Sequence, residues 1–150
     1  MVCSWWFVVN FKSTKLLFMP TVQKFEELEV WQLARELSRK IYPLTFVDPI
    51  AKDFRYKDQL RGSCGSIMDN IAEGFERGSK LEFINLLTIA KGEAGELKSQ
   101  LYRGLDNKYF TSILFEELYA LVNRITKMLT TFIHYLNKTS IKGQKFKERN

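Results

Sequence analysis

The stretch SIMDNIAEGFERGS, from Ser66 to Ser79, decides the fold because it joins the end of one helix to the start of the next. Its apolar positions, Ile67 and Ile71, are four residues apart and continue a helical stripe that begins further upstream. Polar side chains then crowd the end of that stripe, and Gly78 interrupts the chain just before Ser79. The stretch therefore predicts two long helices joined by a short polar corner.

The polar corner allows two interpretations. In the first it is structural: Gly74 caps one helix, and Ser79 with Glu82 forms a capping box for the next. Asn70 would then bond a neighbouring helix's backbone, and Glu73 and Arg77 would pair as i,i+4 neighbours. In the second interpretation, the side chains of residues 70, 73 and 77 face a second subunit or an RNA phosphate.

Apolar residues at spacings of three and four predict four helices over residues 25–137. We expect them at about Glu26–Pro43, Asp53–Glu73, 79–107 and Ser112–Leu136, with Pro43 ending the first. We interpret Gly62 and Gly65 in the second helix as points of tight helix packing. Short connections and three-four spacing favour an all-α, antiparallel up-down four-helix bundle.

The charge of the chain is concentrated at its ends. The 150 residues carry a formal net charge of +6, but residues 25–137 hold 15 Lys and Arg against 16 Asp and Glu. We therefore divide the chain into an N-terminal extension (1–24), a four-helix domain (25–137) and a basic tail (138–150) that we expect to be disordered. Residues 1–18 are interpreted as lying upstream of a natural start at Met19. A basic tail commonly binds the phosphates of nucleic acids without regard to their sequence.

Few residues are suited to catalysis. The single histidine, His134, lies near the end of the last predicted helix, where no Glu-x-x-His or Ser-His-Asp arrangement forms around it. Cys64 falls on a core face, so we expect a small buried hydrophobe and a reducing, cytoplasmic location. The apolar run at residues 1–11 is too short to cross a bilayer. We expect no enzymatic activity, no metal, no cofactor and no membrane association.

Three blocks carry a resemblance to a known family: LEVWQLARELSRKIYPLT (28–45), DQLRGSCGSIMDNIAEGFERGSKLEF (58–83) and IAKGEAGELKSQL (89–101). They resemble the bacterial four-helix-bundle proteins encoded within intervening sequences of 23S ribosomal RNA genes. The resemblance implies a ring-like homopentamer without established catalytic activity. It also implies remote kinship with the accessory variability protein of diversity-generating retroelements, a pentamer that binds nucleic acid and a reverse transcriptase. The family signature falls on Ser66, Ile67, Asn70, Ile71, Ala72, Glu73 and Gly74.

Two functions remain open from the sequence. The first is a non-catalytic oligomeric protein that binds RNA or DNA through basic side chains. Its candidate residues are Lys57, Arg61, Arg77, Lys80, Lys138, Lys142, Lys145, Lys147 and Arg149. The second is a scaffold or accessory subunit with a protein partner, such as a reverse transcriptase. Five aromatic residues are candidate contacts, either with such a partner or between subunits of the homo-oligomer: Trp31, Tyr42, Tyr102, Phe110 and Tyr119.

Overall fold

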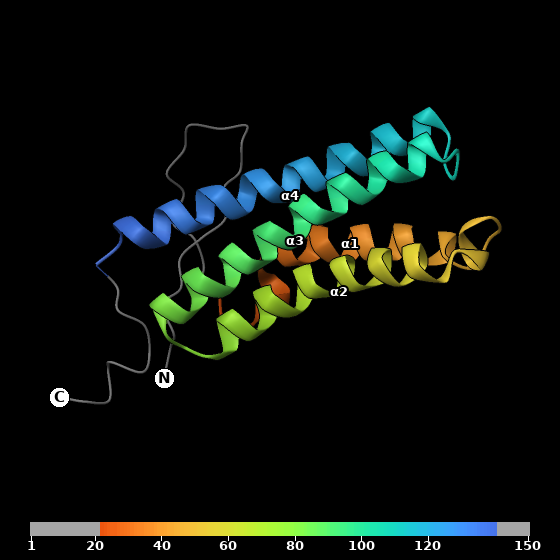
Figure 1. Ribbon diagram of the computed structural model, residues 1–150. Coiled ribbons are helices and arrows are strands. Elements are labelled where there is room, and N and C mark those ends of the chain that lie inside the picture. The colour runs from red at the N-terminus through yellow and green to blue at the C-terminus, as the bar shows by residue number, and fades with distance from the viewer. Residues whose placement is uncertain (1–21, 141–150) are drawn as a thin grey trace.

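The computed structural model describes residues 22–140 as four helices in a bundle, with consecutive helices antiparallel (Figure 1). They are α1 (Glu29–Leu44), α2 (Phe54–Glu76), α3 (Lys80–Asp106) and α4 (Ser112–Lys138), with short 3-10 turns η1 (Phe25–Glu27) and η2 (Ile50–Lys52). No strand occurs within this part of the chain. The prediction of an all-α four-helix fold is confirmed. The predicted N-terminal extension, apart from residues 22–24, and the tail from residue 141 onward lie outside the described residues.

One continuous apolar core lies between the helices. Helix α2 packs on α1 and α3, and α4 packs on α3 and α1, so that each helix has two neighbours. The stripes that the sequence predicts all face inward: the core includes Leu37 and Ile41 of α1, Leu60 and Ile67 of α2, Leu87 and Leu97 of α3, and Leu118 and Ile125 of α4. Each of these side chains is at most 1% exposed. Apolar burial of this kind is the main favourable term in folding.

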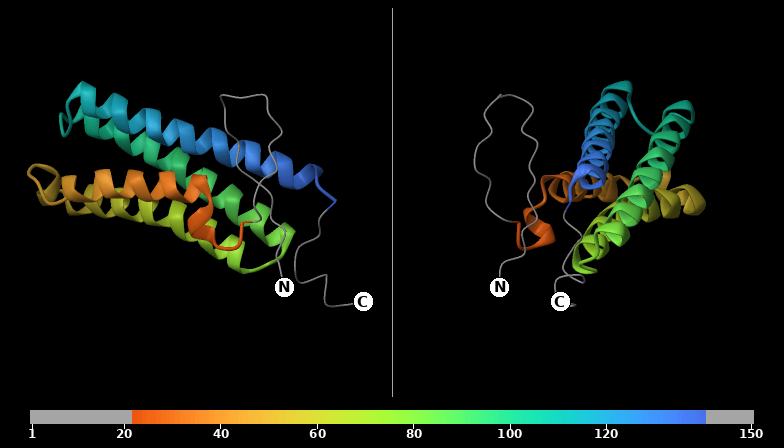
Figure 2. Two further views of the ribbon diagram at one scale, coloured as in Figure 1. Left: turned by 180° about the vertical axis from the view of Figure 1, so that it is seen from behind. Right: turned by 90° about the vertical axis from the view of Figure 1, so that its left-hand side faces the viewer.

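The two ends of the bundle differ in what they hold. The α2–α3 corner, η1 and the last turn of α4 lie at one end, which we call the corner end (Figure 2). The α1–α2 and α3–α4 connections lie together at the other end, where the Tyr109 hydroxyl donates to Asp53 Oδ2 at 2.8 Å. Asp53 also caps α2 by accepting from the Tyr56 backbone N–H at 3.0 Å. This capping carboxylate therefore ties the two connections together.

The helix ends differ from the prediction in small ways. Pro43 lies inside the last turn of α1, which ends one residue later at Leu44. Proline has no backbone N–H to donate to the carbonyl four residues earlier, so α1 loses one hydrogen bond in its final turn and ends there. Helix α2 ends at Glu76, three residues beyond the predicted Glu73. Ser79 occupies the N-cap position of α3, but its side chain makes no capping hydrogen bond there.

The glycines of α2 take different roles from those predicted. Gly74 is buried inside the helix rather than capping it, and a Cβ there would lie 2.6 Å from Phe83 Cδ2. Gly78, with φ of 65°, takes the left-handed conformation that leaves the helix. Gly62 and Gly65 have nothing within 4 Å of a built Cβ. The predictions of a Gly74 cap and of tight packing at Gly62 and Gly65 are therefore wrong, and α3 approaches α2 closely at Gly74 instead.

Candidate nucleic-acid interface

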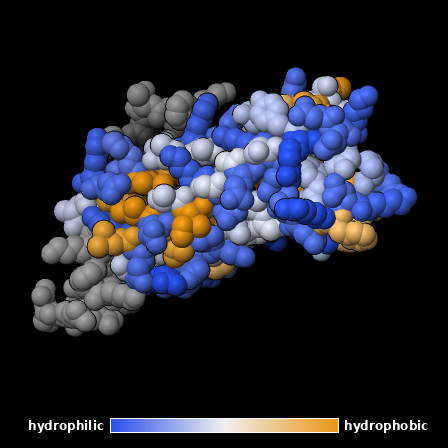
Figure 3. Space-filling model, viewed as in Figure 1, coloured by the Kyte–Doolittle hydropathy of each residue, from blue (hydrophilic) through white to orange (hydrophobic). Residues whose placement is uncertain are grey.

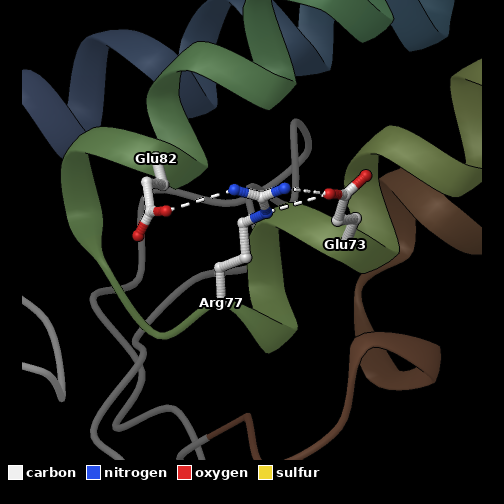
Figure 4. Close-up of polar contacts among 3 residues, drawn as sticks. All are labelled: Glu73, Arg77 and Glu82. Carbon is white, nitrogen blue, oxygen red and sulfur yellow. Dashed lines mark hydrogen bonds and ion pairs between the residues drawn. The ribbon is translucent and has the colours of Figure 1, made fainter.

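Arg77 joins the ends of α2 and α3 at the polar corner (Figure 4). Its Nε donates to Glu73 Oε1 at 2.9 Å, its Nη2 also reaches that oxygen, and its Nη1 donates to Glu82 Oε1 at 3.2 Å. These two carboxylates hold the pKa of Arg77 above its ordinary value, mainly through the hydrogen bond that Arg77 donates to Glu73. The predicted pairing of Glu73 with Arg77 is confirmed. Because two acids share one guanidinium, the group carries a net negative charge and is a poor phosphate site.

The remaining signature residues are structural within α2. Ile67 and Ile71 are fully buried in the core. The Asn70 side chain donates through Nδ2 to the Ser66 carbonyl at 2.7 Å, one turn back in the same helix. The prediction that Asn70 bonds a neighbouring helix's backbone is therefore wrong. The Ala72 side chain is half-buried.

The candidate basic residues do not gather into one site. Arg77, Lys80 and Lys138 lie at the corner end, where Lys80 Nζ donates to the Thr139 carbonyl at 3.0 Å. Lys57 and Arg61 lie toward the opposite end of the bundle, in the first turns of α2. The tail candidates Lys142, Lys145, Lys147 and Arg149 fall outside the described residues.

Arg61 lies between two aromatic side chains of the neighbouring chain segment. Its guanidinium carbon is 4.6 Å from the ring centre of Tyr42 and 4.7 Å from that of Phe46. Its Nε donates to Thr45 Oγ1 at 2.8 Å, and no described residue accepts from its two terminal nitrogens. Tyr42 is 50% exposed and Phe46 is 63% exposed. This is a cation–π arrangement that still offers donors and ring surface to a ligand.

Similar pairs continue along the same side of α1 and α2. Arg35 lies 5.8 Å from the Trp31 ring centre, and Lys57 Nζ lies 4.6 Å from that of Phe54, which is 70% exposed. We call the whole set the α1–α2 strip: Trp31, Arg35, Arg39, Tyr42, Phe46, Phe54, Lys57 and Arg61. The first four recur at spacings of four, four and three, which places them on one stripe of α1, and Phe46 follows in the turn just after that helix. The spacing of these residues is a property of the sequence, but they were not predicted as a group.

The other aromatic candidates behave differently. Phe110 is only 8% exposed and packs over Gly104, where a Cβ would lie 2.2 Å from its Cε2 atom, so the prediction of an exposed contact there is wrong. Tyr102 and Tyr119 pack on each other across α3 and α4, with ring centres 5.3 Å apart. Tyr102 is still 48% exposed. These rings mainly hold two helices together.

The described residues offer little for metal or acid–base chemistry. No group of three or more His, Cys, Asp or Glu side chains within residues 22–140 could hold a metal ion. Cys64 is buried as predicted, and burial raises the pKa of its thiol to about 12. His134 is exposed on α4. None of the helices between residues 22 and 140 has the length and apolarity needed to cross a membrane.

Comparison with known proteins assigns the family. The family model for the 23S rRNA-intervening sequence protein matches residues 26–131. The chain belongs to this family. It is also similar to the crystal structure of a Bacteroides thetaiotaomicron protein of unknown function from the S23 ribosomal protein family. That structure has 29% sequence identity and a TM-score of 0.65, and the match covers 73% of this chain and 99% of the other. No curated protein matches closely. The family resemblance predicted from the three sequence blocks is confirmed.

Proposed function

We propose that this family member is a non-catalytic, homo-oligomeric protein that binds nucleic acid. The observation that carries the proposal is the distribution of unpaired cations. Four cations of the α1–α2 strip form no ion pair with any carboxylate of the described residues: Arg35, Arg39, Lys57 and Arg61. They lie together on one side of the bundle. Polyanion binding needs cations of this kind, since each phosphate neutralised releases a condensed counterion.

The basic tail would add a second source of positive charge. Residues 138–150 carry five Lys and Arg against one Glu, and Lys138 ends α4 at the corner end. A basic segment there would contact phosphates without regard to sequence. The proposal thus combines a fixed basic surface on α1 and α2 with an electrostatic contribution from the tail.

The proposed oligomer is a homopentamer, as the family resemblance implies. Apolar side chains gather over the first half of α3 (Figure 3), where Leu81 is 68% exposed and Ile89 is 43% exposed. Exposed apolar area of this kind is typical of an association surface. Sedimentation velocity at micromolar concentration tests this proposal, and a strict monomer would contradict it.

Nucleic-acid binding is tested by filter binding to a structured RNA over a series of salt concentrations. We expect the affinity to fall steeply with salt, and we expect deletion of residues 141–150 to weaken binding and reduce the salt slope. Deletion at that point leaves Thr139, the partner of Lys80, in place. The oligomer mass should not change. Affinity that is absent at low salt, or that ignores salt, would remove the proposal.

The exposed apolar surface of α3 also favours a second candidate function, a scaffold or accessory subunit for another protein, such as a reverse transcriptase. Leu81→Ser and Ile89→Ser discriminate between the two. The nucleic-acid proposal expects RNA affinity per protomer to survive these changes, even where the oligomer is altered. A scaffold would instead lose its protein partner in the serine variants, and neither the wild type nor the variants would bind RNA.

A further inference from the structure

We propose that the α1–α2 strip binds an unpaired segment of nucleic acid, with bases stacked on its exposed rings and phosphates held by its arginines. This inference rests on the proposed function and names the part of the nucleic acid that is recognised. It depends on three features of the strip: open aromatic surface, unpaired cations, and the close spacing of the two along α1 and α2.

The first feature is the exposure of the rings. Phe46, Phe54 and Tyr42 are between 50% and 70% exposed, whereas the described phenylalanines Phe75, Phe83 and Phe132 are nearly or fully buried in the core. Open aromatic faces accept any base by stacking, because every base has a π face. Within a duplex the faces of the bases are already stacked on one another. The rings of the strip therefore favour a strand whose bases are free.

The second feature is the state of the cations. On the α1–α4 side of the bundle Lys40 pairs with Glu117 and Arg124 with Glu29, each at 2.6 Å. The cations of the strip have no such partner among residues 22–140, although Glu36 and Asp58 lie on the same two helices. An unpaired guanidinium can place two parallel donors on one phosphate.

The third feature is spacing. Arg35 and Arg39 are one turn apart, about 6 Å along the helix axis. Trp31 lies one turn before Arg35, and Tyr42 lies about one turn after Arg39, so an aromatic ring flanks the two arginines on each side along α1. Arg61 brings a further cation from α2 between Tyr42 and Phe46. Cations flanked by aromatic rings suit a single strand, because its phosphates can contact the cations while its bases stack on the rings.

The test compares a fluorescent 20-nucleotide oligothymidine with a duplex of the same length by anisotropy at two salt concentrations. Phe46→Leu with Phe54→Leu removes two rings while keeping apolar bulk. Arg35→Gln with Arg39→Gln removes two unpaired cations. The matched control is Lys91→Gln with Lys127→Gln, two exposed lysines on α3 and α4.

We expect the wild-type protein to bind the single strand more tightly than the duplex. The ring variant should lose about tenfold or more in single-strand affinity and little in duplex affinity. The arginine variant should lose affinity for both and show a single-strand salt slope smaller by about 1.4. The lysine control should change single-strand affinity by less than the arginine variant does. Thermal melting should show that all three variants fold.

Other outcomes overturn the inference. Equal affinity for both probes with no effect of the ring variant would leave salt-dependent binding, and hence the proposed function, in place without a stacking site. Equal losses in the arginine and lysine variants would assign the binding to diffuse charge. A ring variant with a smaller oligomer mass would identify the strip as a subunit interface. Binding of neither probe by the wild type would remove both proposals.

Discussion

Gly74 offers the sharpest test of how the bundle is packed. Replacing it by alanine adds one methyl group at a point where α2 and α3 are in contact. The new Cβ would lie 2.6 Å from Phe83 Cδ2 and 3.1 Å from Leu86 Cβ. Contacts below 3.0 Å between carbon atoms are strongly repulsive, so either the Phe83 ring or the helix backbone must shift.

The ring has little room to shift. Phe83 is fully buried, and its ring centre lies 5.2 Å from that of Phe132 and 6.1 Å from that of Phe75, both edge-to-face. Overpacking of this kind costs about 1–3 kcal/mol. Alanine regains about 1 kcal/mol of helix propensity over glycine. We therefore expect Gly74→Ala to lower the free energy of unfolding by up to about 2 kcal/mol.

Gly62→Ala is the matched control, since it makes the same change in the same helix. A Cβ at Gly62 meets nothing within 4 Å, so only the propensity gain of about 1 kcal/mol remains. In thermal denaturation, each 1 kcal/mol moves the Tm of a chain of this size by about 2–4 °C. The two variants should therefore move Tm in opposite directions. Measurement at two protein concentrations separates folding from oligomer dissociation.

A Gly74→Ala protein that is as stable as Gly62→Ala would refute the reasoning. It would mean that α2 and α3 are not in close contact at this point.

Three further outcomes are expected. Cys64 should react with a thiol reagent only after unfolding. Because its native pKa of about 12 lies above the ordinary value of 9.0, its contribution to stability should decline as pH rises above 9. A Cys64→Ala protein that loses as much stability as the wild type between pH 9 and 11 would contradict this. Tyr56→Phe removes a buried hydrogen bond of 2.7 Å to the Gln100 carbonyl and should cost about 1 kcal/mol in urea denaturation; an unchanged midpoint would count against the bond. Asp53→Ala removes the cap of α2 and the acceptor of the Tyr109 hydroxyl, and should cost about 1–2 kcal/mol, whereas Asp53→Asn should recover part of it.

Much of the fold could be predicted because its signals are local. The three-four spacing of residues such as Leu87, Ala90, Ala94 and Leu97 reports which side of a helix is apolar, and a helix must bury that side somewhere. The i,i+4 pairing of Glu73 with Arg77 is local in the same sense. Such features depend on helical geometry alone, and they survive whatever the neighbouring helices do.

The errors concern which contacts form between different helices. From the sequence, Gly74 and Gly78 are equally suitable helix ends, and Gly62 and Gly65 are equally suitable packing points. Only the position of Phe83 decides that Gly74 must lack a side chain.

The candidate site illustrates the same limit. The basic residues near the chain ends stand out in composition, whereas the α1–α2 strip emerges only when α2 places Arg61 between Tyr42 and Phe46 of the preceding segment. Whether a cation is paired depends on which carboxylate another helix brings within reach, as Glu82 of α3 does for Arg77.

The sequence by itself determined the four helices, their inward stripes and the family, because periodicity and signature are properties of short segments. The tertiary structure decided which glycine is packed, which arginine is neutralised and which rings stay open. Those outcomes follow from close packing, in which each side chain meets partners that its own segment does not contain.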